Sequence, residues 1–452
     1  MRRLAWSILF AWPLTVAACG SGGGGSSEAS DSGEHDDATA IADAGATADD
    51  GAPTDAGASP NDAAREAGDA SNGPRIKYVL VLVKENHTFD NYFTGFPGAD
   101  TTTTAKLSNG STLTRPTAPN GQLSQDICHA NSCGQKAYSN GSMSGFDLIG
   151  AGDLPFIRYT EQQIPNYWQY ARNFVLVDHL FSTTLGPSTP GHAVFWGAQS
   201  LVLDNAGCTK DGGACGGFGC AAGSDVKVTA YDPDTCTTST VSPCFDAPVL
   251  ADHLPSGFTW TDYGGELALM FKSVYDTSNY QAHFRAQSSL VSDLMAGKLA
   301  NLMIAHLWSG EESEHPAADP CPGENFTVQI VNAAMATPEW NEMAIVITWD
   351  DWGGFYDHVA PPVHKCKNGE IFQNGFRLPA IILSPYAKKG VVLSTPAEQA
   401  SIPRLIEDLW GMTYMSTRDP HARDGDAGSL MGAFDFAQAP RAPLPLTTRT
   451  CP

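Results

Sequence analysis

Beyond residue 74, the chain alternates polar loops with short, nearly continuous apolar runs that are rich in Val, Ile and Leu. A run of this kind places apolar side chains on both faces of a strand, which is typical of a sheet covered by helices on both sides. Four runs fit the pattern: residues 77–83, 301–305, 344–349 and 379–383. The pattern therefore predicts an α/β fold with a mainly parallel central sheet between helices.

Three further segments have the composition of helices that would cover this sheet. They are residues 190–200, 326–336 and 402–412. Pro403 stands in the first turn of the last segment, where its fixed φ suits a helix. No repeat and no second linker interrupts residues 75–452, so we expect one large domain. The Gly- and Cys-rich stretch 207–244 predicts a surface excursion held by disulfides.

The N-terminal residues 1–19 have the pattern of a signal peptide that ends in a lipobox. Arg2 and Arg3 precede an apolar run too short to span a bilayer, and the sequence VAAC ends at Cys19. By resemblance to bacterial lipoproteins, Cys19 is acylated after cleavage and anchors the exported protein in the membrane. Soluble export, with a chance cysteine, is the alternative. Gly20 follows instead of Asp, which favours the outer membrane; the other expected locations are periplasmic or secreted.

Residues 20–74 consist mainly of Gly, Ala, Ser, Asp and Thr and contain no aromatic residue. Such a composition cannot bury enough apolar surface to offset the entropy of the chain, so a disordered, acidic tether is predicted. The tether holds twelve acidic residues against the single cation Arg65, and residues 75–452 still carry a net charge of −14. This acidity argues against a nucleic-acid partner.

Apart from Cys19 the chain holds ten cysteines, an even number that predicts five disulfides in an oxidising compartment. The alternative is a zinc cluster drawn from five closely spaced cysteines. These are Cys208, Cys215, Cys220, Cys236 and Cys244. Their irregular spacing without a CxxC pair favours disulfides, whose connectivity the sequence leaves open.

Candidate chemistry follows directly after two of the predicted strands. The first strand leads into Glu85 and Asn86, and the third leads into the paired acids Asp350 and Asp351. Ligands of open α/β sheets bind beyond the carboxyl ends of the strands, and oxygen-rich ligand sets suit Mg, Ca or Mn. The alternative is that these acids are helix caps or solvated loop residues.

The segment GPSTPGH places Ser188 in a turn that leads into an apolar helix. Backbone N–H groups and the helix dipole favour an anion there, as a nucleophile acting on a phosphoryl group requires. The alternative is an ordinary Ser or Thr helix cap before Pro190. Several histidines could donate to phosphate oxygens or protonate a leaving alkoxide, but composition alone does not rank them.

Five segments, read together and in order, resemble the bacterial phosphoesterase family of phospholipases C and acid phosphatases. They are KENHTFDNYFTG (residues 84–95), residues 145–191 ending in GPSTPG, EHP (314–316), DDWGGFYDHVAPP (350–362) and GFRLPAIILSPYAKKG (375–390). The resemblance spans residues 76–412. It implies an α/β core similar to the alkaline-phosphatase and sulfatase fold, with one divalent metal ion (Ca, Mg, Mn or Zn) and a hydroxyl nucleophile.

The resemblance also assigns residues. The metal ligands it implies are Glu85, Asn86, Ser188, Asp350 and Asp351. The catalytic residues it implies are Ser188, His129, His315 and His358. Ser188 would attack phosphorus, His129 and His315 would stabilise the charged oxygens, and water would hydrolyse a phosphoserine intermediate. Either His315 or His358 would protonate the leaving alcohol.

The chain departs from the family pattern at three positions. Gly191 replaces an Asn of the nucleophile motif, Ser188 stands where many phospholipases C have Thr, and Asp351 stands where many have Glu. The last two choices resemble the acid-phosphatase branch. The chain ends at Pro452, where long phospholipases C continue into β-rich domains. We therefore expect a small phosphomonoester or a phospholipid head group as substrate.

Two other functions remain open at this point. Gly191 and the long tether suggest a catalytically degenerate, lipid-anchored binding protein on the same fold. A sulfatase-like or phosphonate hydrolase would share the fold, but the CxPxR motif that sulfatases modify is absent from the sequence.

Overall fold

The computed structural model describes residues 75–205, 207–208, 219–265, 269–275, 280–369 and 371–452. These residues belong to one compact unit of the chain. The signal peptide and tether expected for residues 1–74 lie outside the described residues, as does Cys215. None of the helices in the described part is long and apolar enough to cross a bilayer.

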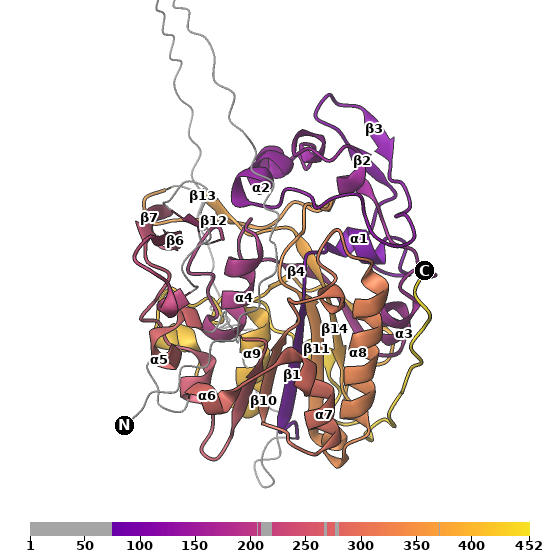
Figure 1. The fold of residues 1–452 in the computed structure, drawn as a ribbon, viewed down its shortest axis with the longest axis vertical. Helices are drawn as coiled ribbons and strands as arrows, with labels where there is room; N and C mark the ends of the chain where they lie inside the picture. The colour runs from indigo at the N-terminus through magenta and orange to yellow at the C-terminus, as the bar shows by residue number, and fades with distance from the viewer. Residues whose placement is uncertain (1–74, 206, 209–218, 266–268, 276–279, 370) are drawn as a thin grey trace, which may run out of the picture. The chain divides into compact units, whose positions relative to one another are not determined.

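Nine strands form one sheet at the centre of the domain (Figure 1). From one edge to the other they are β15 (Val391–Leu393), β4 (Val175–Phe181), β14 (Arg377–Leu383), β11 (Met343–Trp349), β1 (Tyr78–Lys84), β10 (Leu302–His306), β8 (Trp260–Tyr263) and β9 (Phe284–Arg285), and β16 (Ala397–Glu398) also pairs with β4. All neighbours are parallel except β14, which runs antiparallel to both β11 and β4. The predicted mainly parallel sheet is confirmed.

The four apolar runs correspond to β1, β10, β11 and β14. Strand β14 runs antiparallel to β11, and the described residues between the two strands contain no helix of the kind that usually connects parallel neighbours. Strand β4 was not predicted, because Asp178 and His179 interrupt its apolar sequence.

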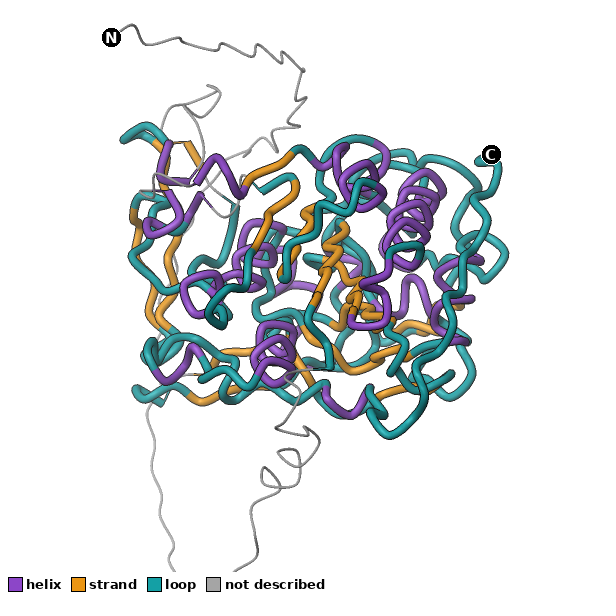
Figure 2. The backbone as a smooth tube through the Cα atoms, turned by 90° about the horizontal axis from the view of Figure 1, so that it is seen from below, coloured by secondary structure: helices purple, strands orange, loops and turns teal. Residues whose placement is uncertain are grey.

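Helices lie on both sides of the sheet (Figures 1 and 2). The longer ones are α2 (Asn131–Tyr138), α3 (Pro165–Asn173), α4 (Ser188–Gly197), α8 (Pro320–Met335) and α9 (Ser401–Trp410), and the short ones are α1 (Phe89–Phe93), α5 (Lys272–Tyr275), α6 (Tyr280–His283) and α7 (Leu290–Met295). Helices α3 and α7 both pack against α8, while α4 packs against α9. The three predicted helices are therefore present as α4, α8 and α9, with shifted ends.

Small β-sheets lie outside the central sheet. They are β2 (Thr104–Lys106) with β3 (Thr112–Thr114), β5 (Gly207–Cys208) with β6 (Val226–Asp232) and β7 (Thr237–Val241), and β12 (Val363–Lys365) with β13 (Ile371–Gln373). Strands β5, β6 and β7 belong to the Cys-rich excursion predicted for residues 207–244.

Four disulfides are present in the described part of the chain. They join Cys128 to Cys133, Cys220 to Cys244, Cys236 to Cys366, and Cys321 to Cys451. Three cysteines of the alternative zinc cluster are thus in disulfides, which excludes that cluster. The side chains of Cys208 and Cys215, which would form the expected fifth bond, lie outside the described residues.

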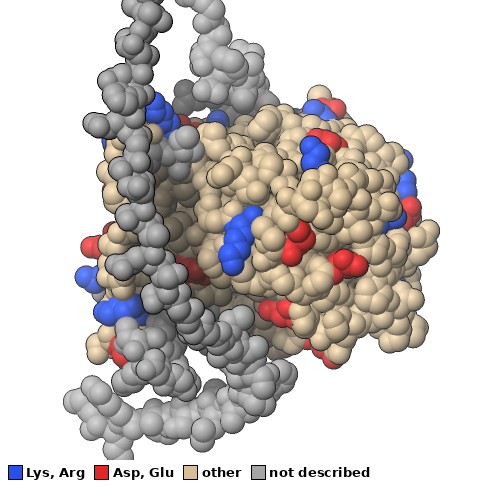
Figure 3. Space-filling model, turned by 90° about the horizontal axis from the view of Figure 1, so that it is seen from above, with Lys and Arg blue, Asp and Glu red and all other residues tan. Residues whose placement is uncertain are grey.

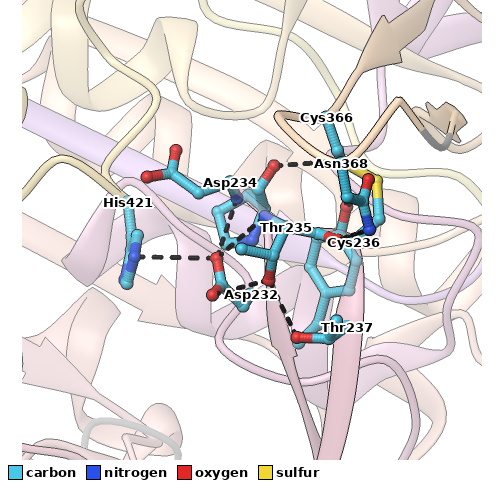
Figure 4. The surroundings of a disulfide bond; sticks show 10 residues. Asp232, Asp234, Thr235, Cys236, Thr237, Cys366, Asn368 and His421 are labelled. Carbon is cyan, nitrogen blue, oxygen red and sulfur yellow. Dashed lines mark hydrogen bonds and ion pairs between the residues drawn. A yellow bond between two sulfur atoms is a disulfide. The ribbon is translucent and has the colours of Figure 1, made fainter.

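The Cys236–Cys366 bond ties the β6–β7 hairpin to the loop before β13 (Figure 4). Next to it, the Asp232 carboxylate accepts the backbone N–H of Asp234 at 2.8 Å and lies 3.8 Å from His421. These contacts close the turn of the hairpin, so the excursion is held by covalent and polar links.

The face seen from above carries scattered charges (Figure 3). Among the described residues drawn there, Lys and Arg form separate blue spots between red carboxylates and wide uncharged areas. The expected absence of a nucleic-acid partner stays a prediction.

Candidate active site

Three central strands end next to one another and position the candidate site. Val83 of β1 pairs with Thr348 of β11 on one side and with His306 of β10 on the other. The residues that follow the ends of β1 and β11, Glu85 and Asp350, therefore come together at the carboxyl edge of the sheet, where α/β proteins bind ligands.

The paired acids after β11 are buried, and each uses one oxygen to fix its position. Asp350 Oδ1 accepts the backbone N–H groups of Asn86 at 2.8 Å and Asp351 at 2.7 Å. Asp351 Oδ1 accepts the backbone N–H of Gly353 at 2.6 Å. The second oxygen of each acid remains available to side chains from β1 and α4. These acids are neither helix caps nor solvated loop residues.

Ser188 is the first residue of α4, and its side chain reaches the acids. Its hydroxyl lies within donating distance of Asp351 Oδ2 at 3.1 Å and of Glu85 Oε2 at 3.3 Å. The N-cap of α4 is Pro187, and no side chain caps the helix. The helix-cap alternative for Ser188 is therefore wrong, and the predicted ligands Glu85, Ser188 and Asp351 are brought together.

Asn86 completes this group with an amide oxygen. Its φ of 67° lies in the left-handed region, which Asn tolerates better than most residues. The His129 Nδ1–H donates to Ile127 O at 2.7 Å, so the unprotonated Nε2 of His129 accepts Asn86 Nδ2–H at 3.1 Å. Asn86 Oδ1 is buried and has no hydrogen-bond partner among the described residues. His129 thus orients Asn86 towards the site.

His192 lies in the middle of the site, although the sequence analysis did not single it out. Its Nε2 is 2.8 Å from Glu85 Oε1 and 3.4 Å from Asp350 Oδ2, and its Nδ1 is 2.7 Å from His306 Nδ1. His192 follows Ser188 by four residues, a spacing that places both side chains on one face of a helix. This spacing could have identified His192 from the sequence.

The site has more buried acid than its own cations balance. Burial and the charge of Asp350 raise the pKa of Glu85, and the same two causes raise the pKa of Asp351 well above its ordinary value. Burial alone would raise the pKa of Asp350, but the contact with charged His192 and the backbone N–H of Asn86 together outweigh burial and hold that pKa at about 2. Three neighbouring carboxyl groups cannot all ionise here unless a further cation lies among them.

The residues present fit a divalent cation. Asp350 Oδ2 and Asn86 Oδ1 are buried, and neither oxygen has a hydrogen-bond partner in the described part of the chain. Buried oxygens without partners are expected at a position where a cation binds. One ligand atom each from Glu85, His192 and Asp350 lies within 4.8 Å of the others. A set rich in carboxylate, amide and hydroxyl oxygens is typical of Mg, Ca or Mn sites.

Two glycines permit this convergence. A Cβ on Gly191 would lie 2.2 Å from Asp350 O, and a Cβ on Gly353 would lie 2.1 Å from Asn86 O. Gly353 also has a φ of +58°, which L side chains rarely adopt. Gly191 stands where the family motif has Asn. At this position α4 approaches the end of β11 so closely that no side chain fits between them.

A buried ion pair holds two site residues in place. Lys84 Nζ lies 3.2 Å from Glu314 Oε1, and both side chains are fully buried. Glu314 also accepts hydrogen bonds from two tyrosine hydroxyls, one of them that of Tyr167 at 2.5 Å. Glu85 directly follows Lys84, and His315 directly follows Glu314. The ion pair therefore fixes the backbone positions from which the Glu85 and His315 side chains extend.

His315 joins the site beside His129, with ring centroids 5.6 Å apart. Burial opposes its charge, but the carboxylates of Glu85 and Asp126 outweigh burial and raise the pKa of His315 above 6.5. The position and the charge of His315 thus suit a proton donor near the acids.

His358 lies in a different cluster. Its Nδ1 is 2.7 Å from Asp90 Oδ2 and its Nε2 is 3.1 Å from Asp100 Oδ1. Arg377 pairs with Asp357 at 2.8 Å and with Asp90 at 3.3 Å. Among the described residues, the hydrogen bonds of His358 connect it to this cluster and not to the Ser188 group. Its catalytic role stays a prediction.

Comparison with known proteins identifies the family of this chain. The model of the family described as "Phosphoesterase family" matches residues 76–413. The chain belongs to the phosphoesterase family, as the ordered segments predicted.

The relatives found by sequence are phospholipases C. Non-specific phospholipase C6 of Arabidopsis thaliana is 24% identical, with 82% of this chain and 74% of the relative covered. Phospholipase C A of Mycobacterium tuberculosis is 23% identical, with 82% and 79% covered. Non-hemolytic phospholipase C of Pseudomonas aeruginosa is 24% identical, with 82% and 58% covered.

Solved structures with a similar fold are more distant. A protein in the alkaline phosphatase superfamily from Vibrio parahaemolyticus has a TM-score of 0.33 and 10% identity, with 75% of this chain and 67% of that chain covered. A 2-O GAG sulfatase has a TM-score of 0.36 and 9% identity, with 82% and 76% covered. These TM-scores are low, and the family assignment rests on the sequence match.

Proposed function

We propose that this phosphoesterase is a metal-dependent phosphoric ester hydrolase in which Ser188 is the nucleophile and a phosphoserine is the intermediate. One observation carries the proposal: the Ser188 hydroxyl lies 3.1 Å from Asp351 and 3.3 Å from Glu85, at the start of a helix. Such an arrangement activates a hydroxyl and places it where a phosphoryl anion is favoured.

The ion would be held by Glu85, Asn86, Ser188, Asp350 and Asp351, and when bound it would lower the pKa of the serine hydroxyl and stabilise charge on phosphoryl oxygens. Ser188 Oγ gives up its proton towards Asp351 Oδ2, forms a bond to phosphorus, and the bond to the leaving oxygen breaks. His315 donates a proton to the leaving alcohol. Water then gives a proton to His315 and attacks the phosphoserine; the P–O bond to Ser188 breaks, phosphate or a phosphorylated head group leaves, and Asp351 returns the proton to Ser188 Oγ.

The substrate we propose is a small phosphomonoester or a phospholipid head group. Release of phosphate from p-nitrophenyl phosphate, compared with release of phosphocholine from phosphatidylcholine, distinguishes the acid-phosphatase type from the phospholipase C type. Ser188→Ala should reduce either activity by about 10³-fold or more. Thr189→Ala is the matched control, because in the described part of the chain this neighbouring hydroxyl makes no hydrogen bond to Glu85, Asp350 or Asp351. Turnover of neither substrate with any divalent metal, or full activity of Ser188→Ala, would contradict the proposal.

The second candidate is a catalytically degenerate binding protein, which was suggested by Gly191. The close approach of Gly191 to the Asp350 backbone, with Ser188 still among the acids, favours the enzyme. Retained binding of a phosphorylated ligand without turnover would favour the binding protein.

Export and anchoring through Cys19 remain part of the proposal. Labelled palmitate should enter the protein in a bacterial host, and Cys19→Ser should prevent this labelling and release the protein from the membrane fraction. Membrane attachment of the Cys19→Ser variant would contradict lipidation at this residue.

A further inference from the structure

We propose that His192 supplies a nitrogen ligand to the metal ion of this site, so that the ligand set is mixed nitrogen and oxygen. The inference rests on the proposed function, because it concerns the same ion. It adds a residue that neither the paired acids nor the resemblance assigned, and it narrows the identity of the metal.

The position of His192 is that of a ligand. Two ligands bound about 2.1 Å from one ion, at right angles, lie about 3 Å apart. His192 Nε2 is 2.8 Å from Glu85 Oε1 and 3.4 Å from Asp350 Oδ2. The distances from Ser188 Oγ to the acids, 3.1 and 3.3 Å, fall in the same range. The imidazole nitrogen therefore lies about as close to the carboxylate oxygens as Ser188 Oγ does, as expected if one ion bound them together.

The ring is held for this role by His306 and Asp262. Both side chains are fully buried. His192 Nδ1 lies 2.7 Å from His306 Nδ1, and His306 Nε2 lies 3.8 Å from Asp262 Oδ2. With an ion bound, His192 would donate its Nδ1–H to His306, and its Nε2, which faces Glu85 and Asp350, would give up its proton and be free to bind the ion. Ligating histidines characteristically donate their second nitrogen to a partner in this way.

A nitrogen ligand changes which ions the site prefers. Imidazole suits Zn, Fe, Ni and Cu better than Ca, whereas a set of oxygen atoms alone favours Ca, Mg and Mn. We therefore infer that the resident ion is a transition metal. His306 acts as a positioning residue, since it contacts His192, and Asp262 lies behind it, 3.8 Å from His306 Nε2.

The test uses the purified protein loaded with Mn²⁺ and pulsed electron paramagnetic resonance. A nitrogen coupling should be present in the wild type and should change when histidine is labelled with ¹⁵N, an experiment that needs no variant. His192→Gln should abolish the coupling, while His129→Gln and His315→Gln retain it. By calorimetry, His192→Gln should weaken Zn²⁺ binding by about 10–100-fold and Ca²⁺ binding far less.

Three results would overturn the inference. Bound Mn²⁺ without nitrogen coupling in the wild type would show a site made of oxygen ligands only and would leave the proposed function intact. A coupling that survives in His192→Gln and disappears in another histidine variant would assign the ligand elsewhere. Failure to bind any divalent metal would overturn the proposed function as well. Circular dichroism spectra of the variants verify that each is folded.

Discussion

Two buried clusters of acids and histidines are formed by residues that follow strands β1 and β11. The clusters differ in how the negative charge of their acids is balanced. The first contains Glu85, Asp350 and Asp351 and faces Ser188. The second contains Asp90 and Asp357, a few residues further along each segment, and it encloses Arg377 together with Arg115.

The electrostatic consequences differ in degree: each cluster holds one acid whose pKa is lowered, Asp350 and Asp90, but the first cluster has two acids with a raised pKa and the second has one, Asp357. Burial opposes the charge of Asp90, but His358, Arg377 and Arg115 outweigh burial and lower the Asp90 pKa below its ordinary value. In the first cluster, burial and neighbouring charge raise the pKa of Glu85 and Asp351. Buried acids that are paired with arginines of the same cluster form a structural cluster. Buried acids without arginines need a bound ion or a proton from solution to balance their charge.

The largest effect is expected from removing a charge of the first cluster. Asp351→Asn should lower hydrolysis by about 10⁴-fold, because the variant loses both a ligand and the acceptor of the serine proton. In the absence of metal the same variant should be at least as stable as the wild type, since a buried unbalanced carboxyl group is gone. Activity assays and thermal melts with EDTA measure both. A large loss of metal-free stability would contradict the distinction between the clusters.

The opposite result is expected when the second cluster loses its cation. Arg377→Met should destabilise the protein by about 3–5 kcal/mol, because Asp90 and Asp357 remain buried without a partner. Urea unfolding with and without metal measures this loss, which should not depend on metal. Arg172→Met, at a half-exposed ion pair with Glu161, is the control and should cost less than about 1 kcal/mol. Equal losses in the two variants would refute the argument.

His315 and His358 were both candidates for the acid that protonates the leaving alcohol, and they provide a third test. His315→Gln should reduce hydrolysis of an alkyl phosphate by about 10²-fold and that of p-nitrophenyl phosphate much less, because p-nitrophenolate leaves without a proton. His358→Gln should affect both substrates similarly and weakly, since its contacts lie in the Arg377 cluster. A substrate-dependent loss in His358→Gln instead would make His358 the acid.

The smallest effect is expected at a third pair of buried acids, Glu407 and Asp424. Burial and the charge of Asp424 raise the pKa of Glu407 to about 9. The folded protein therefore holds a proton that the unfolded chain releases near pH 4, so stability falls as the pH rises from about 4 to 9. Glu407→Gln should remove this fall and raise Tm at pH 8 by about 2–4 °C, with little change at pH 4. A variant whose melting curve keeps the wild-type pH dependence would assign the proton elsewhere.

Much of this molecule was accessible from its sequence. The central strands were predicted because a strand buried on both faces needs an apolar run. The acids after two of these strands were candidate ligands because polar residues at strand ends meet at one edge of the sheet, and the family resemblance supplied the proposed ligand set. The ordered segments of the family also located Ser188 among several possible serines. Strand β4 was missed, since Asp178 and His179 hide its apolar character.

Only the tertiary structure decided the rest, because it depends on residues far apart in the chain. The direction of β14, the pairing of Lys84 with Glu314 and the separation of His358 from Ser188 leave no local pattern in the sequence. His192 is the clearest case. Its spacing from Ser188 was visible, but its place between two acids arises only where the ends of β1, β10 and β11 meet the start of α4.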